Sequence, residues 1–212
     1  MNNRKGILSI VSGFSGSGKG TIMKQLLQQY PDTYALSISA TTRSPRSGEA
    51  HGREYFFVSQ EEFEAMIRDN ALLEYAQYVN HYYGTPRDYV FRQLEAGKDV
   101  ILEIEIQGAL KVKEAYPDTL LLFVTPPSAA ELKKRLTERG TEEEDVIASR
   151  LSRAWQEAQG VEQYDYLVVN DSLAECVQEV HGIIQGQHAR VKENYPLIET
   201  IRAELKDFVK GE

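Results

Sequence analysis

Short apolar runs alternate along the chain with longer segments whose apolar residues recur at helical spacing. The runs at 7–11, 120–124 and 164–169 have the length and composition of buried strands. Segments such as 19–30 and 107–116 instead place apolar residues three or four positions apart. Because strands that alternate with helices build a parallel sheet covered on both faces, the pattern predicts an α/β fold with a parallel sheet flanked by helices.

Residues 34–84 follow a different pattern and predict a mostly β insert between two parts of the α/β core. The insert has short extended segments at 34–39, 53–58 and 71–79. It also has a polar loop at 41–52 and a turn at 80–84. Ser59 and Glu62 form a capping-box pattern that opens a helix within the insert. Thr85 and Pro86 predict the next core helix, with Thr85 as its cap and Pro86 at its first position.

A glycine-rich loop follows the first apolar run. Gly13, Gly18 and Lys19 match the pattern G-x-x-x-x-G-K within the sequence GFSGSGKGT. Glycines let successive backbone N–H groups point at one anion, and the helix that follows adds the positive end of its dipole. The loop could instead be a glycine turn without a ligand, but the strand before it, the helix after it and the register of Lys19 favour phosphate binding. We therefore expect a P-loop NTPase-type core that holds the phosphates of a nucleoside triphosphate. The loop residues, which the family resemblance described below makes ATP-binding, are Gly13, Phe14, Ser15, Gly16, Ser17, Gly18, Lys19, Gly20 and Thr21.

Composition and charge narrow the classes of function. The chain has 212 residues and a formal net charge of −8 at pH 7, which disfavours general affinity for nucleic acid. No apolar run is long enough to cross a bilayer, and the N-terminal segment does not have the pattern of a signal peptide. Cys176 is the only cysteine, so we expect a cytoplasmic protein without an intrachain disulfide.

The polar loop of the insert carries a candidate site for a second phosphate. Arg43 and Arg46 flank Pro45, and Tyr55 and Tyr83 lie in the same insert. Guanidinium forks and phenol hydroxyls suit one phosphate group. The alternative is a solvated basic loop, which is the usual case for isolated arginines. The phosphate loop elsewhere in the chain favours the binding site.

Carboxylates in two segments are candidates for reading a base. Glu74 lies in the otherwise apolar and aromatic segment LLEYAQY, where it either faces solvent by alternation or accepts hydrogen bonds from a ligand. One carboxylate can accept from both N1–H and the exocyclic amino group of guanine, whereas adenine lacks this donor pair. Further hydrogen bonds to the purine could come from Ser39, Thr85 and Glu105. Residues 99–106 predict a strand that places Glu103 and Glu105 on one face.

Arginines gather in the region 135–153, where two predicted helices meet at Gly140. They are Arg135, Arg139, Arg150 and Arg153. Cations here could neutralise the charge that builds on a phosphoryl group during transfer. The alternative is ion pairing with the neighbouring Glu142, Glu143 and Glu144, and we expect some of the arginines to do only this.

The segment after residue 186 has apolar residues at roughly helical spacing: Val191, Ile198, Ile201, Leu205 and Phe208. We expect a terminal helix packed on the core. A contact between two copies of the chain is the alternative.

In these segments the chain resembles the guanylate kinase family, and the match runs in order to about residue 186. It rests on the glycine loop at 13–21 and on the motifs SATTRSPRSGE at 39–49, REYFFVS at 53–59, LLEYAQY at 72–78, HYYGTP at 81–86, ILEIEIQGA at 101–109, LKKRLTERGTE at 132–142 and VVND at 168–171. The family commonly has Asp where this chain has Glu103 and Glu105.

The resemblance implies ATP-dependent, in-line phosphorylation of GMP, and of dGMP, to the diphosphate with Mg²⁺. It implies a kinase-like domain at 1–186 and a helical extension at 187–212. Within the domain it implies an ATP-binding core at 1–33 and 85–186, an NMP-binding lobe at 34–84 and a helical lid at about 135–155.

The resemblance also implies roles for individual residues. The catalytic residues would be Lys19, Arg43, Arg135, Arg139 and Arg150. The GMP phosphate would be held by Arg43, Arg46, Tyr55 and Tyr83, and guanine would be read by Ser39, Glu74, Thr85 and Glu105. Asn170 would lie near adenine, and Mg²⁺ would be held through Thr21, Glu103 or water.

Two other functions remain open at this point. Gly20 and Thr21 resemble the adenylate-kinase loop, so a kinase for AMP or a pyrimidine monophosphate is one alternative. A guanylate-kinase-like protein-interaction module without catalysis is the other, although such modules typically lack a working phosphate loop. The expected oligomeric state is a monomer or a homodimer.

Overall fold

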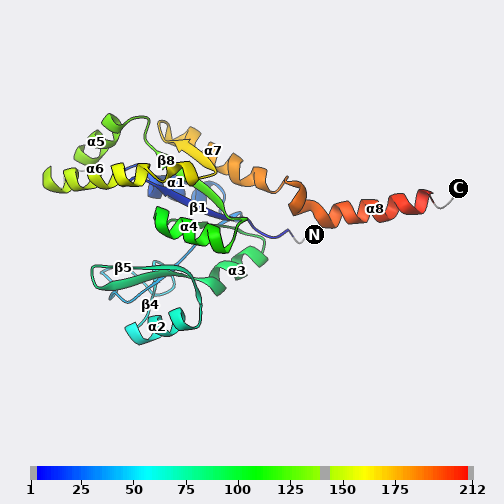
Figure 1. Cartoon of the computed structure of the whole chain (residues 1–212), viewed down its shortest axis with the longest axis horizontal. Coiled ribbons are helices and arrows are strands. Elements are labelled where there is room, and N and C mark those ends of the chain that lie inside the picture. Colours follow the sequence, from blue (N-terminus) through cyan, green and yellow to red (C-terminus); the bar gives the residue numbers. More distant parts are fainter. Residues whose placement is uncertain (1–3, 139–143, 210–212) are drawn as a thin grey trace.

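The computed structural model describes residues 4–138 and 144–209, which form a parallel-sheet core with a smaller lobe beside it (Figure 1). The core sheet has five strands in the described part of the chain, in the order β2-β7-β1-β8-β9, and every neighbouring pair is parallel. The strands are β1 (Leu8–Gly13), β2 (Tyr34–Leu36), β7 (Asp99–Leu102), β8 (Leu120–Thr125) and β9 (Tyr166–Val169).

Helices cover both faces of this sheet, which confirms the predicted α/β class. One apolar cluster joins Val11 to Ile22 of α1 and Val177 of α7, and another joins Ile10 to Val90 of α3. Neighbouring residues of β1 thus face opposite helix layers, as the alternation of a strand requires. The helices are α1 (Lys19–Gln29), α3 (Arg87–Glu95), α4 (Ile106–Ala115) and α7 (Leu173–Gln187), with a 3₁₀ turn at η1 (Val161–Gln163).

The smaller lobe is a mixed sheet backed by one helix, as the mostly β insert predicted. Its strand order is β4-β3-β6-β5. Phe63 of the helix is fully buried against Ala40 and Leu72. The capping box is present, because Glu62 N–H donates to Ser59 Oγ at 3.1 Å and Ser59 N–H donates to Glu62 Oε2 at 2.7 Å. The elements are β3 (Ser39–Thr41), β4 (Tyr55–Phe57), β5 (Leu72–Tyr78), β6 (His81–Pro86) and α2 (Gln60–Arg68).

Two boundaries of the insert differ from the prediction. The segment 34–39 is not one strand, because β2 pairs with β7 in the core sheet and β3 pairs with β4 and β6 in the lobe. The lobe sheet therefore begins at Ser39. The predicted turn at 80–84 is mostly strand β6, and the chain reverses at Val79 and Asn80, which have φ of 45° and 63°. The sequence signal was weak here because Val is a poor residue for a left-handed turn position.

Two predictions near the core also need correction. The strand predicted at 99–106 ends at Leu102, and α4 begins at Ile106. Glu103 and Glu105 thus lie in the connection, where the period of a strand no longer applies. Thr85 belongs to β6 and does not cap α3, because Pro86 takes the N-cap position.

Two helices lie at one end of the core, in the region that the resemblance implies is a lid: α5 (Ala129–Glu138) and α6 (Glu144–Ala158). Leu132 and Leu136 of α5 pack with Ile147 of α6, and Phe14 of the glycine loop packs against this cluster. The lid helices are thereby attached to the loop itself. The predicted break at Gly140 and the residues Glu142 and Glu143 lie outside the described part of the chain.

The last helix leaves the body of the molecule (Figure 1). After α7 the chain passes through the 3₁₀ turn η2 (Val191–Asn194) into α8 (Tyr195–Val209). No residue of α8 is buried, so the expectation that the tail packs on the core is wrong. Within the described residues, no helix combines the length and apolar character needed to span a membrane.

Candidate active site

The glycine loop curls between the end of β1 and the start of α1. Gly16 and Gly18 have φ of 92° and 93°, the left-handed region in which side chains with a Cβ are strained. A Cβ on Gly18 would also lie 2.4 Å from Nδ2 of Asn170. Lys19 folds back over the loop, and its Nζ donates to the carbonyl oxygens of Gly13 at 2.5 Å and Phe14 at 3.1 Å. The loop therefore has the curled backbone and the lysine that phosphate binding requires.

Asn170 fixes this loop from the end of β9. Its Nδ2 donates to the carbonyl of Ser17 at 2.8 Å, and its backbone carbonyl accepts from Nη2 of Arg135 at 3.0 Å. Arg135 is also paired with Glu131, at 2.8 Å from Nε to Oε1. Asn170 thus holds the loop, and Arg135 ties α5 to the end of β9.

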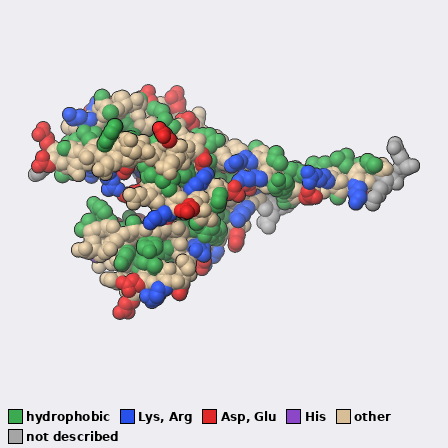
Figure 2. Space-filling view, in the orientation of Figure 1, with side chains coloured by type: hydrophobic (Ala, Val, Ile, Leu, Met, Phe, Trp, Pro, Cys, Tyr) green, Lys and Arg blue, Asp and Glu red, His purple; other side chains and the backbone are tan. Residues whose placement is uncertain are grey.

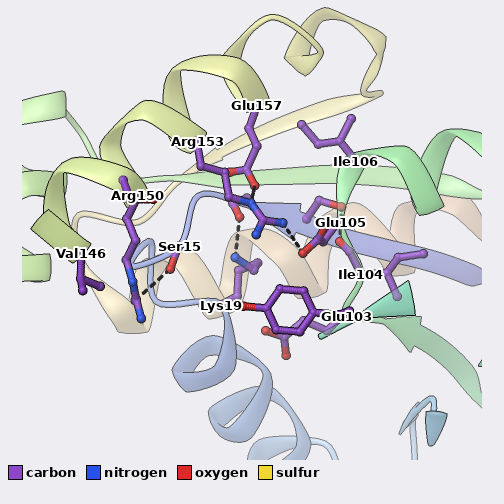
Figure 3. Close-up of a pocket in the computed structure, with 14 residues that line it drawn as sticks. Ser15, Lys19, Glu103, Ile104, Glu105, Ile106, Val146, Arg150, Arg153 and Glu157 are labelled. Carbon is purple, nitrogen blue, oxygen red and sulfur yellow. Dashed lines mark hydrogen bonds and ion pairs between the residues drawn. The ribbon is translucent and has the colours of Figure 1, made fainter. Parts of the chain in front are cut away.

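A cavity of about 510 Å³ opens in front of the loop (Figure 3). Lys19 and Ser15 line it from the loop, and Arg150 and Arg153 reach it from α6. Nη1 of Arg150 donates to Oγ of Ser15 at 3.1 Å. Cations from two distant parts of the chain therefore converge on one space, as binding of a triphosphate would require.

Carboxylates share the same cavity. Arg153 bridges two of them, because it forms an ion pair with Glu105 and its Nε lies 3.1 Å from Oε1 of Glu157 (Figure 3). Desolvation raises the pKa of Glu157, and Oε2 of this residue has no hydrogen-bond partner among the described residues. Desolvation likewise raises the pKa of Glu103, which remains solvent-accessible at the cavity wall, while the nearby Lys19 lowers it. The positive charges of this cavity thus lie close to carboxylates that partly neutralise them.

A second cavity, of about 400 Å³, lies against the lobe and adjoins the first. Both are lined by Tyr78 and by residues 103–105. The space-filling view shows the molecule hollowed between the core and the lobe (Figure 2). Two ligands bound in these cavities would therefore meet beside the same residues.

Glu74 is the carboxylate on the lobe side of this second cavity. Its Oε1 accepts from Oγ1 of the buried Thr85 at 2.7 Å. Helix α4 approaches closely, since a Cβ on Gly108 would lie 3.2 Å from Oε2 of Glu74. Burial raises the pKa of Glu74, while Thr85 and the charge of Lys111 lower it. Glu74 does not simply face solvent, and it is placed to accept hydrogen bonds from a ligand.

Arg43 is held rigidly in the polar loop by a residue that the sequence did not single out. Its guanidinium donates to both oxygens of Glu49, at 2.8 and 3.0 Å, and lies 5.1 Å from the ring centre of Tyr55. These hydrogen bonds lower the pKa of Glu49 to about 2 and raise that of Arg43. Arg46 donates its backbone N–H to the same carboxylate at 2.8 Å, and its side chain is exposed. Rings of Tyr55 and Tyr83 lie 6.1 Å apart beside this cluster.

Ten of the candidate residues line the two adjoining cavities. The first is lined by Gly13, Ser15, Lys19, Glu103, Glu105 and Arg150, and the second by Ser39, Tyr55, Glu74, Tyr83 and Glu105. Thr21 is exposed on α1, and Arg139 lies outside the described residues. Within the described residues no cluster of three or more His, Cys, Asp or Glu side chains is arranged for a metal ion.

Sequence reasoning assigned no site role to Glu49, Lys111 or Glu157. Arg153 was counted among the lid arginines, but its partner Glu105 is 48 positions away in the chain. The pairing of Glu49 could have been predicted from the sequence, because Glu49 follows Arg43 and Arg46 within one short loop.

Comparison with known proteins identifies relatives along nearly the whole chain. A family model described as guanylate kinase matches residues 5–187. The chain is 48% identical over 201 residues to a guanylate kinase of Caldanaerobacter subterraneus subsp. tengcongensis, covering 95% of this chain and 97% of that protein. It is 51% identical over 190 residues to one of Oceanobacillus iheyensis, covering 90% and 92%. The crystal structure of guanylate kinase from Anaplasma phagocytophilum has a TM-score of 0.69 and 29% identity over 90% of each chain.

Proposed function

Because the chain belongs to the guanylate kinase family, we propose that it transfers the γ-phosphoryl group of ATP to GMP, giving ADP and GDP. The observation that supports this proposal is the pair of adjoining cavities, which share Tyr78 and residues 103–105. One cavity contains the phosphate loop, and the other contains the half-buried carboxylate of Glu74. Two nucleotides held in this way can react in line, so no covalent enzyme intermediate is needed.

The ATP phosphates bind at the glycine loop in this proposal. Backbone N–H groups of the loop and the α1 dipole hold the β- and γ-phosphates, and Lys19 exchanges its carbonyl partners for phosphate oxygens. Arg150 acts from α6 on the charge that moves during transfer. Asn170 and Arg135 position the loop through the Ser17 carbonyl and the Asn170 backbone.

Mg²⁺ in this cavity would be held mainly by substrate phosphates and water. It commonly binds one or two carboxylates together with substrate phosphates and water. Glu103, which lines the cavity together with Lys19, would supply an oxygen ligand. When bound, Mg²⁺ neutralises charge on the phosphate oxygens.

GMP occupies the lobe cavity. Arg43, held by Glu49 against Tyr55, binds the phosphate together with Arg46 and Tyr83. Glu74 accepts from N1–H and the amino group of guanine, and the buried Thr85 keeps that carboxylate oriented. Ser39 lines the same cavity and can reach the base as a further hydrogen-bond partner.

Glu105 needs a change of partner before it can read guanine. Its carboxylate is engaged by Arg153 of the lid helix α6. Binding of GMP therefore competes for Glu105. Arg153 then keeps only Glu157 as a partner and can turn toward the phosphates. The lobe at 39–84 and the lid at about 135–155 then close over both nucleotides and exclude water, which prevents simple hydrolysis of ATP. This chemistry uses ATP and GMP pools, so we place the protein in the cytoplasm.

A coupled phosphotransfer assay tests the proposal. ATP is supplied with GMP, dGMP, AMP, UMP or dTMP, each with and without Mg²⁺. We expect turnover with the guanine nucleotides only, and only with Mg²⁺. Turnover of AMP or UMP at a rate similar to GMP would contradict it, and failure to bind ATP would favour an interaction module.

A further inference from the structure

Helix α8 carries a row of large apolar side chains that nothing in the described structure covers. The exposed fractions are 58% for Leu197, 45% for Ile201, 56% for Leu205 and 78% for Phe208. The helix has 15 residues, and none is buried. Isolated helices of this length are marginal in water, and monomers rarely expose a continuous apolar face. The geometry therefore calls for a partner along this face.

The apolar residues have the spacing of a coiled-coil seam. Ile198, Ile201, Leu205 and Phe208 follow one another at steps of three, four and three residues. With about 3.6 residues per turn, Ala203 lies on the side of the helix opposite this seam. The space-filling view shows apolar atoms running along the projecting segment (Figure 2). A seam of this kind packs best against another helix.

We propose that α8 pairs with α8 of a second copy of the chain, antiparallel, about a two-fold axis that crosses the apolar seam at the level of residue 203. The seam is symmetric about that residue, so Ile198 faces Phe208 of the other copy and Ile201 faces Leu205. This self-complementarity is what a two-fold interface requires. The antiparallel direction follows from the shape in Figure 1, where the body attached to the start of α8 is far wider than a helix. Parallel helices would bring two such bodies to the same end.

Charge disfavours a lipid surface as the occupant. Helix α8 carries Glu199, Glu204 and Asp207 against Arg202 and Lys206, and the whole chain has a formal net charge of −8. Helices that bind anionic membranes are instead rich in Lys and Arg on their polar face. A second copy of this chain needs no such excess of positive charge.

The available area fits a weak dimer. Each apolar side chain that becomes covered removes on the order of 100 Å² from water. With Leu197 and Val209 flanking the seam, the two helices together bury on the order of 1,000 Å². That is close to the lower bound for a specific interface, about 1,000 Å². We therefore expect a dimer that dissociates on dilution.

Sedimentation of the full chain over a range of concentrations tests the pairing. The mass should rise from one chain toward two with concentration. Leu205→Glu should weaken dimerisation by about 100-fold or more, because both copies lose a seam contact. Ala203→Glu adds the same charge on the opposite side of the helix and should leave dimerisation within a few-fold of the parent. A mass of one chain at every concentration would overturn the proposal, as would equal effects of the two variants.

Cross-linking tests the direction of the helices. The only native cysteine, Cys176, is 1% exposed and does not interfere. Arg202→Cys lies beside the seam near the proposed axis and should cross-link to itself with a short bismaleimide. Tyr195→Cys and Val209→Cys should each fail alone but cross-link when mixed. Self-cross-linking of either end variant would overturn the antiparallel arrangement. Binding of the parent chain to anionic vesicles without dimer formation would identify a membrane as the occupant and also overturn the proposal.

Discussion

Replacing Glu74 with glutamine tests the reading of the base most directly. The substitution keeps the size of the side chain and changes one acceptor oxygen into an amide donor. Oγ1 of Thr85 can still donate at 2.7 Å to the remaining oxygen, and the close approach of Gly108 leaves the side chain little room to move. The fold of the lobe should therefore survive, and the effect should fall on the ligand.

The expected loss follows from the hydrogen bonds involved. A carboxylate that accepts from N1–H and the amino group of guanine makes charge-assisted bonds of about 1.5–3 kcal/mol each. In the Glu74→Gln enzyme, one guanine donor faces the amide N–H₂ group and loses its hydrogen bond. The other donor still bonds to the amide oxygen, but this bond is no longer charge-assisted. A net loss of about 3–4 kcal/mol lowers kcat/KM for GMP by about 10²–10³-fold. The amide matches the donor and acceptor of adenine, so kcat/KM for AMP should not fall.

The pH dependence gives an independent readout of the same carboxylate. Desolvation raises the pKa of Glu74, and the protonated acid cannot accept both guanine donors. The KM for GMP should therefore rise as the pH falls through a value above the usual glutamate pKa of about 4.3. Thr85→Val removes a hydrogen bond that lowers this pKa, so it should move the acid limb to higher pH.

The matched control is Glu61→Gln, which removes the same charge from an exposed position on α2. It should leave GMP kinetics and the pH profile unchanged. If Glu74→Gln kept the parent preference for GMP over AMP, the assignment of Glu74 to guanine would be wrong.

Three further predictions follow from other parts of the structure. Val79→Gly should raise the free energy of unfolding by about 1 kcal/mol, and Tm by about 2–4 °C, because Val79 has a φ of 45°; an unchanged or lower Tm in calorimetry would contradict this. Glu49→Gln should raise the KM for GMP with little change in kcat, because Arg43 loses its bidentate partner. In the parent protein, the ion pair of Arg43 and Glu49 stabilises the fold at pH values above the unfolded glutamate pKa. This stabilisation should disappear as the pH falls toward about 2, which circular dichroism would record. Arg150→Ala should lower kcat by about 10²–10³-fold, and Lys at this position should restore only part of it, as steady-state kinetics would test.

Local chemistry explains why the core and the phosphate loop could be predicted. Apolar alternation in β1 and helical spacing in α1 are properties of short segments, and the positive φ of Gly18 is a property of one residue. The predicted parallel sheet and separate β lobe are confirmed for this reason. The roles of individual residues in ATP and GMP binding remain predictions.

Long-range contacts explain what the sequence did not provide. The partner of Arg153 is 48 positions away, and Asn170 reaches a carbonyl 153 positions away. Neither pairing has a local signal. The strand predicted at 99–106 fails for a related reason, because the chain must leave the sheet after Leu102 to begin α4 on its face. Glu103 and Glu105 continue the apolar alternation in sequence, although they lie in the connection.

In the proposed mechanism, the arginines that are paired with carboxylates let a chain of negative net charge bind two polyanionic nucleotides selectively. Arg43 is paired with Glu49, and Arg153 with Glu105 and Glu157. These carboxylates hold the guanidinium groups in place before any substrate arrives, which lowers the entropy lost on binding. A free phosphate must displace these carboxylates from the arginines. A nucleotide makes additional contacts through its base, and these offset the free energy lost when the ion pairs break. If guanine is read by Glu105 as proposed, specificity for the base and release of Arg153 depend on the same exchange of partners.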